Sequence, residues 1–478
     1  MQKLPKHVHV IGICGVATSA LAIAFHKAGV RVTGSDKGFF PPVSTELEKQ
    51  GVSFYAGWHP EKMSAEGDPE VIIVGTASGS QNPETEYAQS KGIRMYSFAE
   101  AIGEFFAKEN SIVCVGTWGK TSSTALLSHI LSHANFSPTY MFGGISLSHE
   151  SSAILTDSKW SVFEGDEYKS SPTDPTAKFF YYKPTHLLMT GVSWDHADLY
   201  PTEQSFFDAF QKLISHIPDT GFIVANSDNA GVKRVLGEAR GSKNMRIISY
   251  GYNSQTDYSY KDVHQTKDGI TFSIMNGKEI YSVRSPMLGA FQAENITGCF
   301  ALAHSLGIEP IKILEAIKSF AGLKRRLEKR LDGDKTSNGI TIFDDIAHSP
   351  EKASSVLSNL RKVYVRHIIA IFEPNIGGRE RSSAYKYNNA FKDADIVIIP
   401  RLTKLKVSED GSSAPMEGQE LFETIKRTHK HVEYIDDDVA LVSYLVSSAK
   451  KGDCIAFLGS HGFRGMIEET VKKFSITQ

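Results

Sequence analysis

The segment of the chain with the clearest chemical potential runs from Ile112 to Thr124. Ile112–Val115 is a short apolar, β-branched run, typical of a buried parallel strand. A glycine turn and an apolar helical pattern follow, and a strand, a glycine loop and a helix N-terminus together form a cradle for anions. Lys120 would reach the terminal phosphates of a nucleotide and Thr121 could place its hydroxyl on Mg²⁺. The predicted phosphate-binding residues are Gly116, Thr117, Gly119, Lys120, Thr121 and Ser122.

This phosphate loop departs from the usual spacing at one position. The common pattern has a glycine five residues before Gly119, and Cys114 stands there instead. The alternative is a glycine turn between a strand and a helix that contains Lys-Thr without binding phosphate.

Two acidic clusters follow predicted strands farther along the chain. Glu164 begins the cluster Glu164–Glu167 after the strand Trp160–Glu164, and His196 lies in the cluster 195–198 after the strand His186–Thr190. Ligands of open α/β sheets bind at the carboxyl ends of strands, so these loops and the phosphate loop could converge on one metal–nucleotide site. The alternative is a solvated glutamate and a structural histidine. Asp195 and Asp198 could orient His196.

The N-terminal block has the pattern of a βαβ nucleotide-binding unit. A strand at His9–Ile11 is followed by a glycine turn, a helix at Thr18–Ala28, a strand at Val30–Thr33 and the acidic turn Gly34–Asp36. Cys14 and Ala17 replace two glycines of the dinucleotide fingerprint. Gly12 and Gly15 could therefore form a Rossmann-like turn without a ligand, and Asp36 could be a turn aspartate.

The alternation of strands and helices continues to the C-terminus. Phe98–Asn110 is predicted as a helix that crosses into the second block, and a third block begins with a strand at Ile340–Asp344 and a helix at Pro350–Arg361. The predicted fold class is α/β with three domains in 478 residues. They are a Rossmann-like domain at 1–108, a P-loop-type central ATPase domain at 109–323 and a Rossmann-like C-terminal domain at 324–478.

The composition is that of an ordinary globular protein. A net charge of −2 gives no basic field for nucleic acid, and the four cysteines are scattered, as expected in a reducing compartment. The chain has no signal-peptide core and no apolar run that would cross a bilayer. We therefore expect a cytoplasmic protein without nucleic-acid or membrane partners, and the sequence leaves its oligomeric state open.

Several motifs, taken in order, resemble those of the Mur ligases of bacterial cell-wall synthesis. The motifs are Gly116–Thr121, Glu164–Tyr168, Asp195–Asp198, the helix start Glu294-Asn295, Gly322–Glu328 and Phe343–Asp345. The resemblance implies three α/β domains and the ATP-dependent formation of an amide bond through an acyl phosphate, with Mg²⁺.

The resemblance also implies residue roles. Lys120 would hold the transferred phosphate, Thr121 and Glu164 would bind one Mg²⁺, and His196 would lie near a second. Further implied contacts are Asn295 with adenine (or, alternatively, as a helix cap), Arg326 with the γ-phosphate, Asp345 with the ATP ribose, and Gly12, Gly15, Ser35 and Asp36 with the UDP-sugar.

Within the family, the sequence is similar to the branch that acts on UDP-N-acetylmuramic acid, and most to the murein peptide ligases. The expected second substrate is the tripeptide L-Ala-γ-D-Glu-meso-diaminopimelate, with L-alanine as the alternative. Arg379, Ser460 and His461 follow predicted strands and are candidates for the pocket of this amine, although each could be an ordinary loop residue. Two other classes stay open: a nicotinamide-dependent oxidoreductase, and a nucleotide-binding regulator without catalysis.

Overall fold

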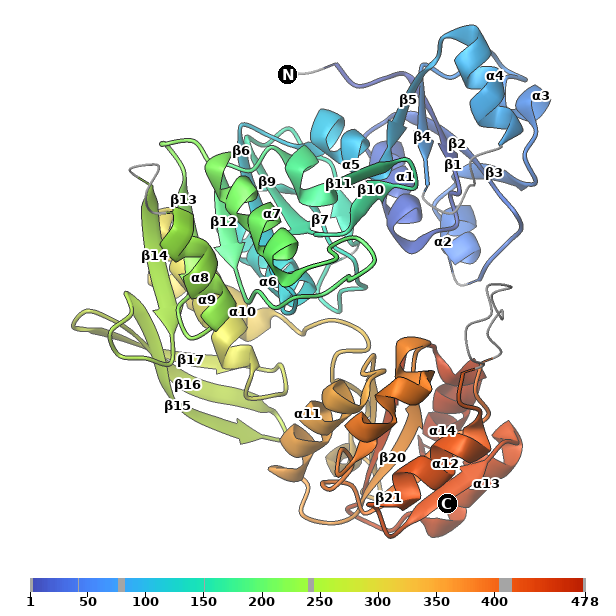
Figure 1. Ribbon diagram of the computed structural model, residues 1–478, viewed down its shortest axis with the longest axis vertical. Coiled ribbons are helices and arrows are strands. Elements are labelled where there is room, and N and C mark those ends of the chain that lie inside the picture. The colour runs from blue at the N-terminus through green and yellow to red at the C-terminus, as the bar shows by residue number, and fades with distance from the viewer. Residues whose placement is uncertain are drawn as a thin grey trace. The chain divides into compact units, whose positions relative to one another are not determined.

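A computed structural model describes residues 3–41, 43–75, 82–149, 151–239, 245–403 and 415–475 (Figure 1). The chain divides into two compact units. The first contains residues 1–263, 271–285 and 291–321, and the second contains residues 264–270, 286–290 and 322–478.

The first unit begins with a five-stranded parallel sheet in the order β3-β2-β1-β4-β5. Val8 and Val10 of the first strand point into a core with helix α1, because alternate residues of a strand face opposite sides of its sheet. The strands are β1 (His7–Ile11), β2 (Arg31–Asp36), β3 (Ser53–Ala56), β4 (Val71–Val74) and β5 (Arg94–Ser97). The helices are α1 (Val16–Lys27), α2 (Val43–Lys49), α3 (Pro60–Met63) and α4 (Pro83–Lys91).

A ten-stranded sheet in the order β17-β16-β15-β14-β13-β12-β6-β9-β7-β8 forms the rest of this unit. Strand β6 lies between β12 and β9 and is parallel to both, so the loops after these three strands emerge at one edge. The strands are β6 (Asn110–Val115), β7 (Thr139–Met141), β8 (Ala153–Ile154), β9 (Trp160–Gly165), β12 (His186–Met189), β13 (Phe222–Asn226), β14 (Arg246–Gly251), β15 (Tyr258–Thr266), β16 (Gly269–Asn276) and β17 (Glu279–Ser285). A separate antiparallel pair is formed by β10 (Lys169–Ser171) and β11 (Asp174–Ala177).

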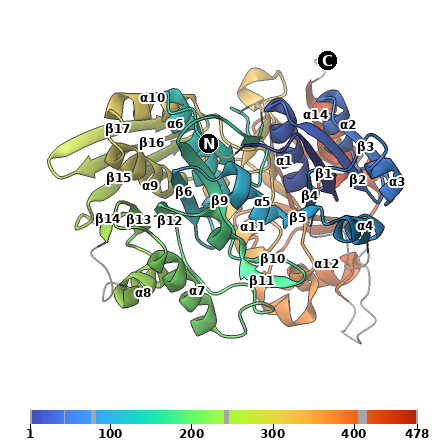
Figure 2. The ribbon, with the colours of Figure 1, turned by 90° about the horizontal axis from the view of Figure 1, so that it is seen from above.

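Helices cover both faces of the large sheet. Figure 2 shows α6, α9 and α10 on one face and α7 and α8 on the other. Their bounds are α6 (Lys120–His133), α7 (Glu203–Ser215), α8 (Ala230–Ala239), α9 (Gln292–Ser305) and α10 (Pro310–Ser319). The helix predicted at Phe98–Asn110 is present, but it ends at Phe106. α5 covers only Phe98–Ala101, a π-helical turn follows at Ile102–Phe106, and Asn110 already begins β6, because the apolar side chains at this crossing pack into the core in a shorter, wider turn.

The second unit has a six-stranded sheet in the order β18-β19-β23-β20-β21-β22, in which only β18 is antiparallel to its neighbour. Ile368, Ala370 and Phe372 face one core, and Ile369 and Ile371 face the other, as expected for a strand buried on both sides. The strands are β18 (Glu328–Leu331), β19 (Thr341–Asp345), β20 (Ile368–Glu373), β21 (Ile396–Pro400), β22 (Val432–Ile435) and β23 (Cys454–Gly459). The helices are α11 (Pro350–Arg361), α12 (Gly418–Lys426), α13 (Asp438–Ser448) and α14 (Met466–Ser475).

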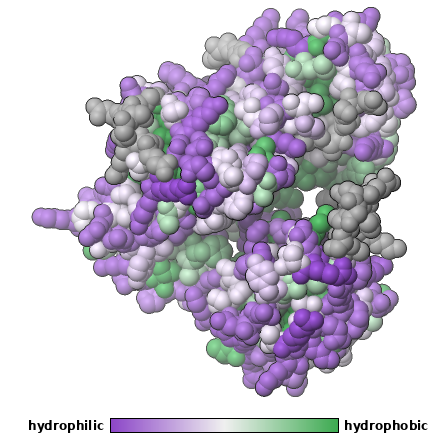
Figure 3. Space-filling model, viewed as in Figure 1, coloured by the Kyte–Doolittle hydropathy of each residue, from purple (hydrophilic) through white to green (hydrophobic). Residues whose placement is uncertain are grey.

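Hydrophilic side chains predominate on the face of the molecule in Figure 3, with hydrophobic ones in smaller patches. Among the residues that the structure describes, no helix combines the length and apolar character that a membrane span requires.

Candidate active site

The phosphate loop connects β6 to α6 and depends on two glycines. Gly116 and Gly119 have φ angles of 136° and 79°, which disfavour residues with a side chain. A Cβ on Gly116 would lie 2.5 Å from Oγ1 of Thr190, and one on Gly119 would lie 2.7 Å from Oδ1 of Asn295. Helix α6 begins directly after Gly119, so Lys120, Thr121 and Ser122 present first-turn N–H groups that the helix itself does not use. This is the backbone arrangement that binds phosphate.

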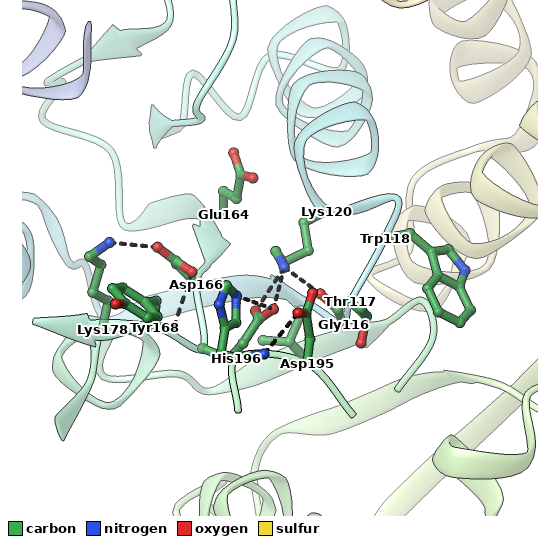
Figure 4. A network of polar contacts seen from close by, with 12 residues as sticks. Gly116, Thr117, Trp118, Lys120, Glu164, Asp166, Tyr168, Lys178, Asp195 and His196 are labelled. Carbon is green, nitrogen blue, oxygen red and sulfur yellow. Dashed lines mark hydrogen bonds and ion pairs between the residues drawn. The ribbon is translucent and has the colours of Figure 1, made fainter. Parts of the chain in front are cut away.

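The side chain of Lys120 makes three polar contacts across the loop (Figure 4). Its Nζ donates to the carbonyl of Gly116 at 2.5 Å and to the two carboxylate oxygens of Glu167 at 2.9 and 2.7 Å. The side chain of Lys120 is 13% exposed and that of Glu167 is 2% exposed. The ammonium group is therefore held at the mouth of the phosphate cradle by a buried carboxylate.

Glu167 is one of the residues at this site for which the sequence predicted no role. Its Oε1 lies 3.8 Å from Nε2 of His196, so it stands between the loop lysine and the histidine. Burial raises the pKa of Glu167, and the neighbouring ammonium of Lys120 opposes that rise. The sequence contains Glu167 in the acidic cluster at the end of β9. The alternation of side chains along a strand does not predict which acidic residue of the following loop points inward.

Thr121 and Glu164 form a second cluster beside the first. Oγ1 of Thr121 donates to Oε1 of Glu164 at 2.6 Å, and the backbone N–H of Gly143 donates to Oε2 at 2.6 Å. In Figure 4 the carboxylate of Glu164 points away from the amino group of Lys120. A hydroxyl and a carboxylate at the start of the helix are hard oxygen donors, so this pair fits Mg²⁺.

Both clusters border one cavity. Its volume is about 250 Å³, and its polar wall contains Lys120, Glu164, Asp166 and Lys178. Burial alone would raise the pKa of Asp166, but the ammonium of Lys178, 2.5 Å away, outweighs burial and lowers it. The remaining wall is mostly apolar and comes from α1, α5 and the π-helical turn after it, the ends of β7 and β9, and Tyr182.

His196 has a left-handed backbone, with φ of 56°, which is uncommon for a residue with a side chain. Asp195 accepts the backbone N–H of His196 at 2.8 Å, and Asp198 accepts the hydroxyl of Tyr168 at 2.7 Å. The ring of Tyr168 lies 4.9 Å from the imidazole. The two aspartates therefore support His196 through its backbone and through Tyr168.

The loop after β12 is fastened to the phosphate loop. The hydroxyl of Thr117 donates to the carbonyl of Ser193 at 2.8 Å and accepts its N–H at 2.9 Å. Thr190 donates to the carbonyl of Trp118 at 2.5 Å, and Asn226 donates to the carbonyl of Thr190 at 2.8 Å. These contacts fix the shape of the cradle, and no sequence motif indicated them.

Asn295 lies inside the first turns of α9 and does not cap it, because the N-cap of this helix is Phe291. Its Nδ2 donates to Gln292 at 3.2 Å, and its Oδ1 lies against Gly119. The capping alternative is wrong, and the amide borders the phosphate loop.

The glycine turn of the N-terminal sheet is stabilised from within. Gly12 donates its N–H to the carbonyl of Ser35 at 2.8 Å, and Asp36 accepts the N–H of Cys14 at 2.8 Å. The hydroxyl of Ser35 is buried and donates to Glu84 at 2.5 Å. Ser35 and Asp36 thus shape the turn that holds Gly12 and Gly15.

Arg326 and Asp345 belong to the second unit. Arg326 is exposed, whereas Asp345 accepts the N–H groups of Leu327 at 2.6 Å and Ala347 at 2.8 Å. Burial raises the pKa of Asp345 to about 6. Its two oxygens therefore hold the backbone beside Arg326, and its role toward the ribose stays a prediction.

The three candidates for an amine pocket differ in exposure. Arg379 is only 2% exposed, and its guanidinium donates to the carbonyls of Met416 and Thr403 and lies 3.2 Å from Glu417. It is a structural side chain, so its role in amine binding is not supported. Ser460 and His461 contact each other at 2.9 Å on an accessible loop. Arg325 holds that loop by donating to the carbonyls of both residues.

Three family models match consecutive parts of the chain. They are described as the Mur ligase family catalytic domain (residues 7–110), the Mur ligase middle domain (115–303) and the Mur ligase glutamate ligase domain (325–461). A UDP-N-acetylmuramate–L-alanine ligase of Mesorhizobium japonicum is 30% identical over 465 residues, which are 95% of this chain and 94% of that protein. The chain belongs to the Mur ligase family. The protein of the same name from Xanthobacter autotrophicus is 30% identical over 97% of this chain and 96% of its own length.

Solved structures agree on the fold. The UDP-N-acetylmuramate–alanine ligase of Thermotoga maritima has a TM-score of 0.78 at 21% identity and covers 98% of this chain and 99% of its own. A murein peptide ligase from Psychrobacter arcticus has a TM-score of 0.68 at 24% identity, with 99% of both chains covered. The predicted three-domain α/β fold is thus confirmed.

Family membership also decides the class of activity. This Mur ligase is an ATP-dependent ligase that forms an amide bond and releases ADP and phosphate. The oxidoreductase and regulator alternatives are wrong. The expected tripeptide substrate is also wrong, because the full-length relatives at about 30% identity carry the name UDP-N-acetylmuramate–L-alanine ligase.

Proposed function

We propose that this Mur ligase joins the carboxylate of UDP-N-acetylmuramic acid to the amino group of L-alanine. The observation that carries the proposal is the name shared by relatives that align over 95–97% of this chain. The phosphate loop, with a lysine and two oxygen donors at its helix, supplies the groups that phosphoryl transfer needs.

In this proposal the sugar-linked carboxylate attacks the γ-phosphate of ATP and gives an acyl phosphate, which the amine of L-alanine then attacks. The ammonium group of Lys120 stabilises the negative charge on the transferred phosphoryl group, and the N–H groups of Thr121 and Ser122 bind the neighbouring phosphate oxygens. Thr121 and Glu164 would hold Mg²⁺, which would neutralise charge on the phosphates. His196, whose Nε2 lies 3.8 Å from Glu167, would contact the reacting carboxylate or its bound ion.

Further roles lie outside this cluster. Asn295 meets the adenine side of the nucleotide, and Arg326 contributes a cation to the phosphates. The turn at Gly12 and Gly15 receives the uridine part of the sugar nucleotide, with Asp36 fixing the turn. Ser460 and His461 remain candidates for the amine.

The test is phosphate release from ATP and Mg²⁺ with UDP-N-acetylmuramic acid and either L-alanine or the tripeptide. We expect release with L-alanine and a mass increase of the sugar nucleotide by one alanyl residue. Release with the tripeptide alone, or release that needs no amine, contradicts the proposal.

A further inference from the structure

The segment from Gly143 to His149, between β7 and β8, lies between two places of functional interest. At its start, the N–H of Gly143 donates to Oε2 of Glu164 at 2.6 Å. Near its end, Oγ of Ser148 accepts the N–H of Ala321 at 2.7 Å. Ala321 is the last residue of the first unit before the chain enters the second. One short segment therefore contacts both a residue of the proposed metal site and the start of the crossover.

The segment is internally braced. Oγ of Ser146 accepts the N–H groups of Ser148 and His149, both at 3.0 Å, and contacts Nδ1 of His149 at 2.9 Å. Ser146 is 9% exposed, whereas its neighbours Ile145 and Leu147 are exposed, so the serine points inward and these hydrogen bonds lie on the inner side of the turn. A side chain that accepts hydrogen bonds from the next backbone groups fixes a turn locally, so Ser148 and Ser146 are held together, and Ser146 is three residues from Gly143 along the chain.

The imidazole of His149 anchors the turn against neighbouring elements. Its ring packs edge-on to Tyr140 at 5.1 Å, Phe142 at 5.5 Å, His129 at 5.6 Å and Phe320 at 6.1 Å. Phe320 precedes Ala321 in the sequence. The ring of His149 therefore contacts one residue and Ser148 hydrogen-bonds the next. Such edge-to-face packing fixes the relative position of the rings.

The crossover itself is suited to a change of direction. Gly322 follows Ala321 with a φ of 95°, a conformation that a residue with a side chain rarely adopts. Hinges are a few residues that absorb a large change of backbone angle. The hydrogen bond from Ala321 to Ser148 thus holds the residue that directly precedes Gly322.

We propose that Ser148 is a positioning residue, which ties the carboxylate of Glu164, through Gly143, to the crossover at Ala321. The inference rests on the proposed function in one respect, the role of Glu164 toward Mg²⁺. It predicts that loss of the Ser148 hydroxyl weakens Mg²⁺-dependent nucleotide binding although Ser148 touches neither the metal nor the nucleotide.

The test compares Ser148→Ala with two matched variants. Ser148→Thr keeps the hydroxyl. Ser151→Ala removes a hydroxyl three residues farther along the chain, which in the described part of the structure accepts the N–H of Ala153. The first readout is the Mg²⁺ concentration that half-saturates ADP binding, measured by calorimetry. The second is the deuterium exchange rate of a peptide that contains the Gly143 amide. Neither readout requires amide-bond synthesis.

We expect Ser148→Ala to raise the half-saturating Mg²⁺ concentration about fivefold, the equilibrium equivalent of one neutral hydrogen bond, and to speed exchange at Gly143. Its affinity for UDP-N-acetylmuramic acid should stay within twofold, as should every reading for Ser148→Thr and Ser151→Ala. Equal Mg²⁺ dependence of Ser148→Ala and Ser151→Ala overturns the inference, and so does ADP binding that is independent of Mg²⁺. The L-alanine assay stands apart, so failure of either proposal is recognised separately.

Discussion

Replacing Lys120 by methionine removes the positively charged amino group and keeps an unbranched side chain as far as Cε. In the proposed reaction the ammonium group of Lys120 stabilises the negative charge that develops on the transferred phosphoryl group. Loss of one such preorganised group costs about 10²- to 10³-fold in kcat. We therefore expect Lys120→Met to release phosphate at about 1% of the normal rate or less.

The same substitution has a second, separable effect on stability. Lys120 is the ammonium 2.7 Å from a carboxylate, Glu167, whose side chain is 2% exposed. A buried charge that loses its partner destabilises a fold by about 3–5 kcal/mol, less if the group takes up a proton. The double variant Lys120→Met/Glu167→Gln contains neither charge, so it should recover most of this loss without recovering activity.

The assays are phosphate release with saturating substrates and urea unfolding of the unsubstituted protein, both single variants and the double variant. The double-mutant cycle gives the coupling free energy between the two side chains. Turnover by Lys120→Met within tenfold of normal would refute the phosphoryl role of Lys120. A double variant no more stable than Lys120→Met would refute the assignment of a buried ion pair.

Three other substitutions test the site and its support. Glu164→Gln should raise the half-saturating Mg²⁺ concentration for ADP binding about tenfold or more in calorimetry, and an unchanged value would remove Glu164 from the metal site. Burial lowers the pKa of His186 to about 4, so below pH 6.5 the unfolded chain takes up a proton that the folded chain does not, and stability falls as the pH drops toward 4. His186→Gln should reduce that slope in urea unfolding by up to about 1.4 kcal/mol per pH unit, and an unchanged slope contradicts the shift. Arg379→Ala should destabilise the second unit by about 2–4 kcal/mol, because its buried guanidinium donates to two carbonyls. A selective rise in KM for L-alanine, with unfolding unchanged, would instead place Arg379 in the amine pocket.

The strand and helix pattern made most of the fold predictable. Buried parallel strands such as Ile112–Val115 are continuous apolar runs, and α11 has the predicted bounds, Pro350–Arg361, because a serine cap and a proline mark its start. The crossing at Phe98 was not predictable in the same way. Its apolar residues have helical spacing, but spacing does not distinguish a long α-helix from a short one that ends in a π-turn.

At the candidate site, residue types were easier to predict than partners. The sequence indicated that the loops at Lys120, Glu164 and His196 end at one sheet edge, because parallel strands share that direction. It could not indicate that Glu167 contacts Lys120, since that depends on how the chain turns after β9. It also named Arg379 and Asp345 as ligand-site candidates, but it could not indicate their burial and hydrogen bonds, because these are tertiary properties.

The division of the chain has a practical consequence for work with fragments. The polypeptide passes from one unit to the other between residues 263 and 264, 270 and 271, 285 and 286, 290 and 291, and 321 and 322. The hairpin tip supplies Lys267, which contacts Asp334 at 2.8 Å, and the short piece before α9 supplies Ala290, which donates to Asn359 at 3.0 Å. A C-terminal fragment that begins at residue 322 would lack both contacts. A fragment cut where the family models divide the chain is therefore an incomplete folding unit.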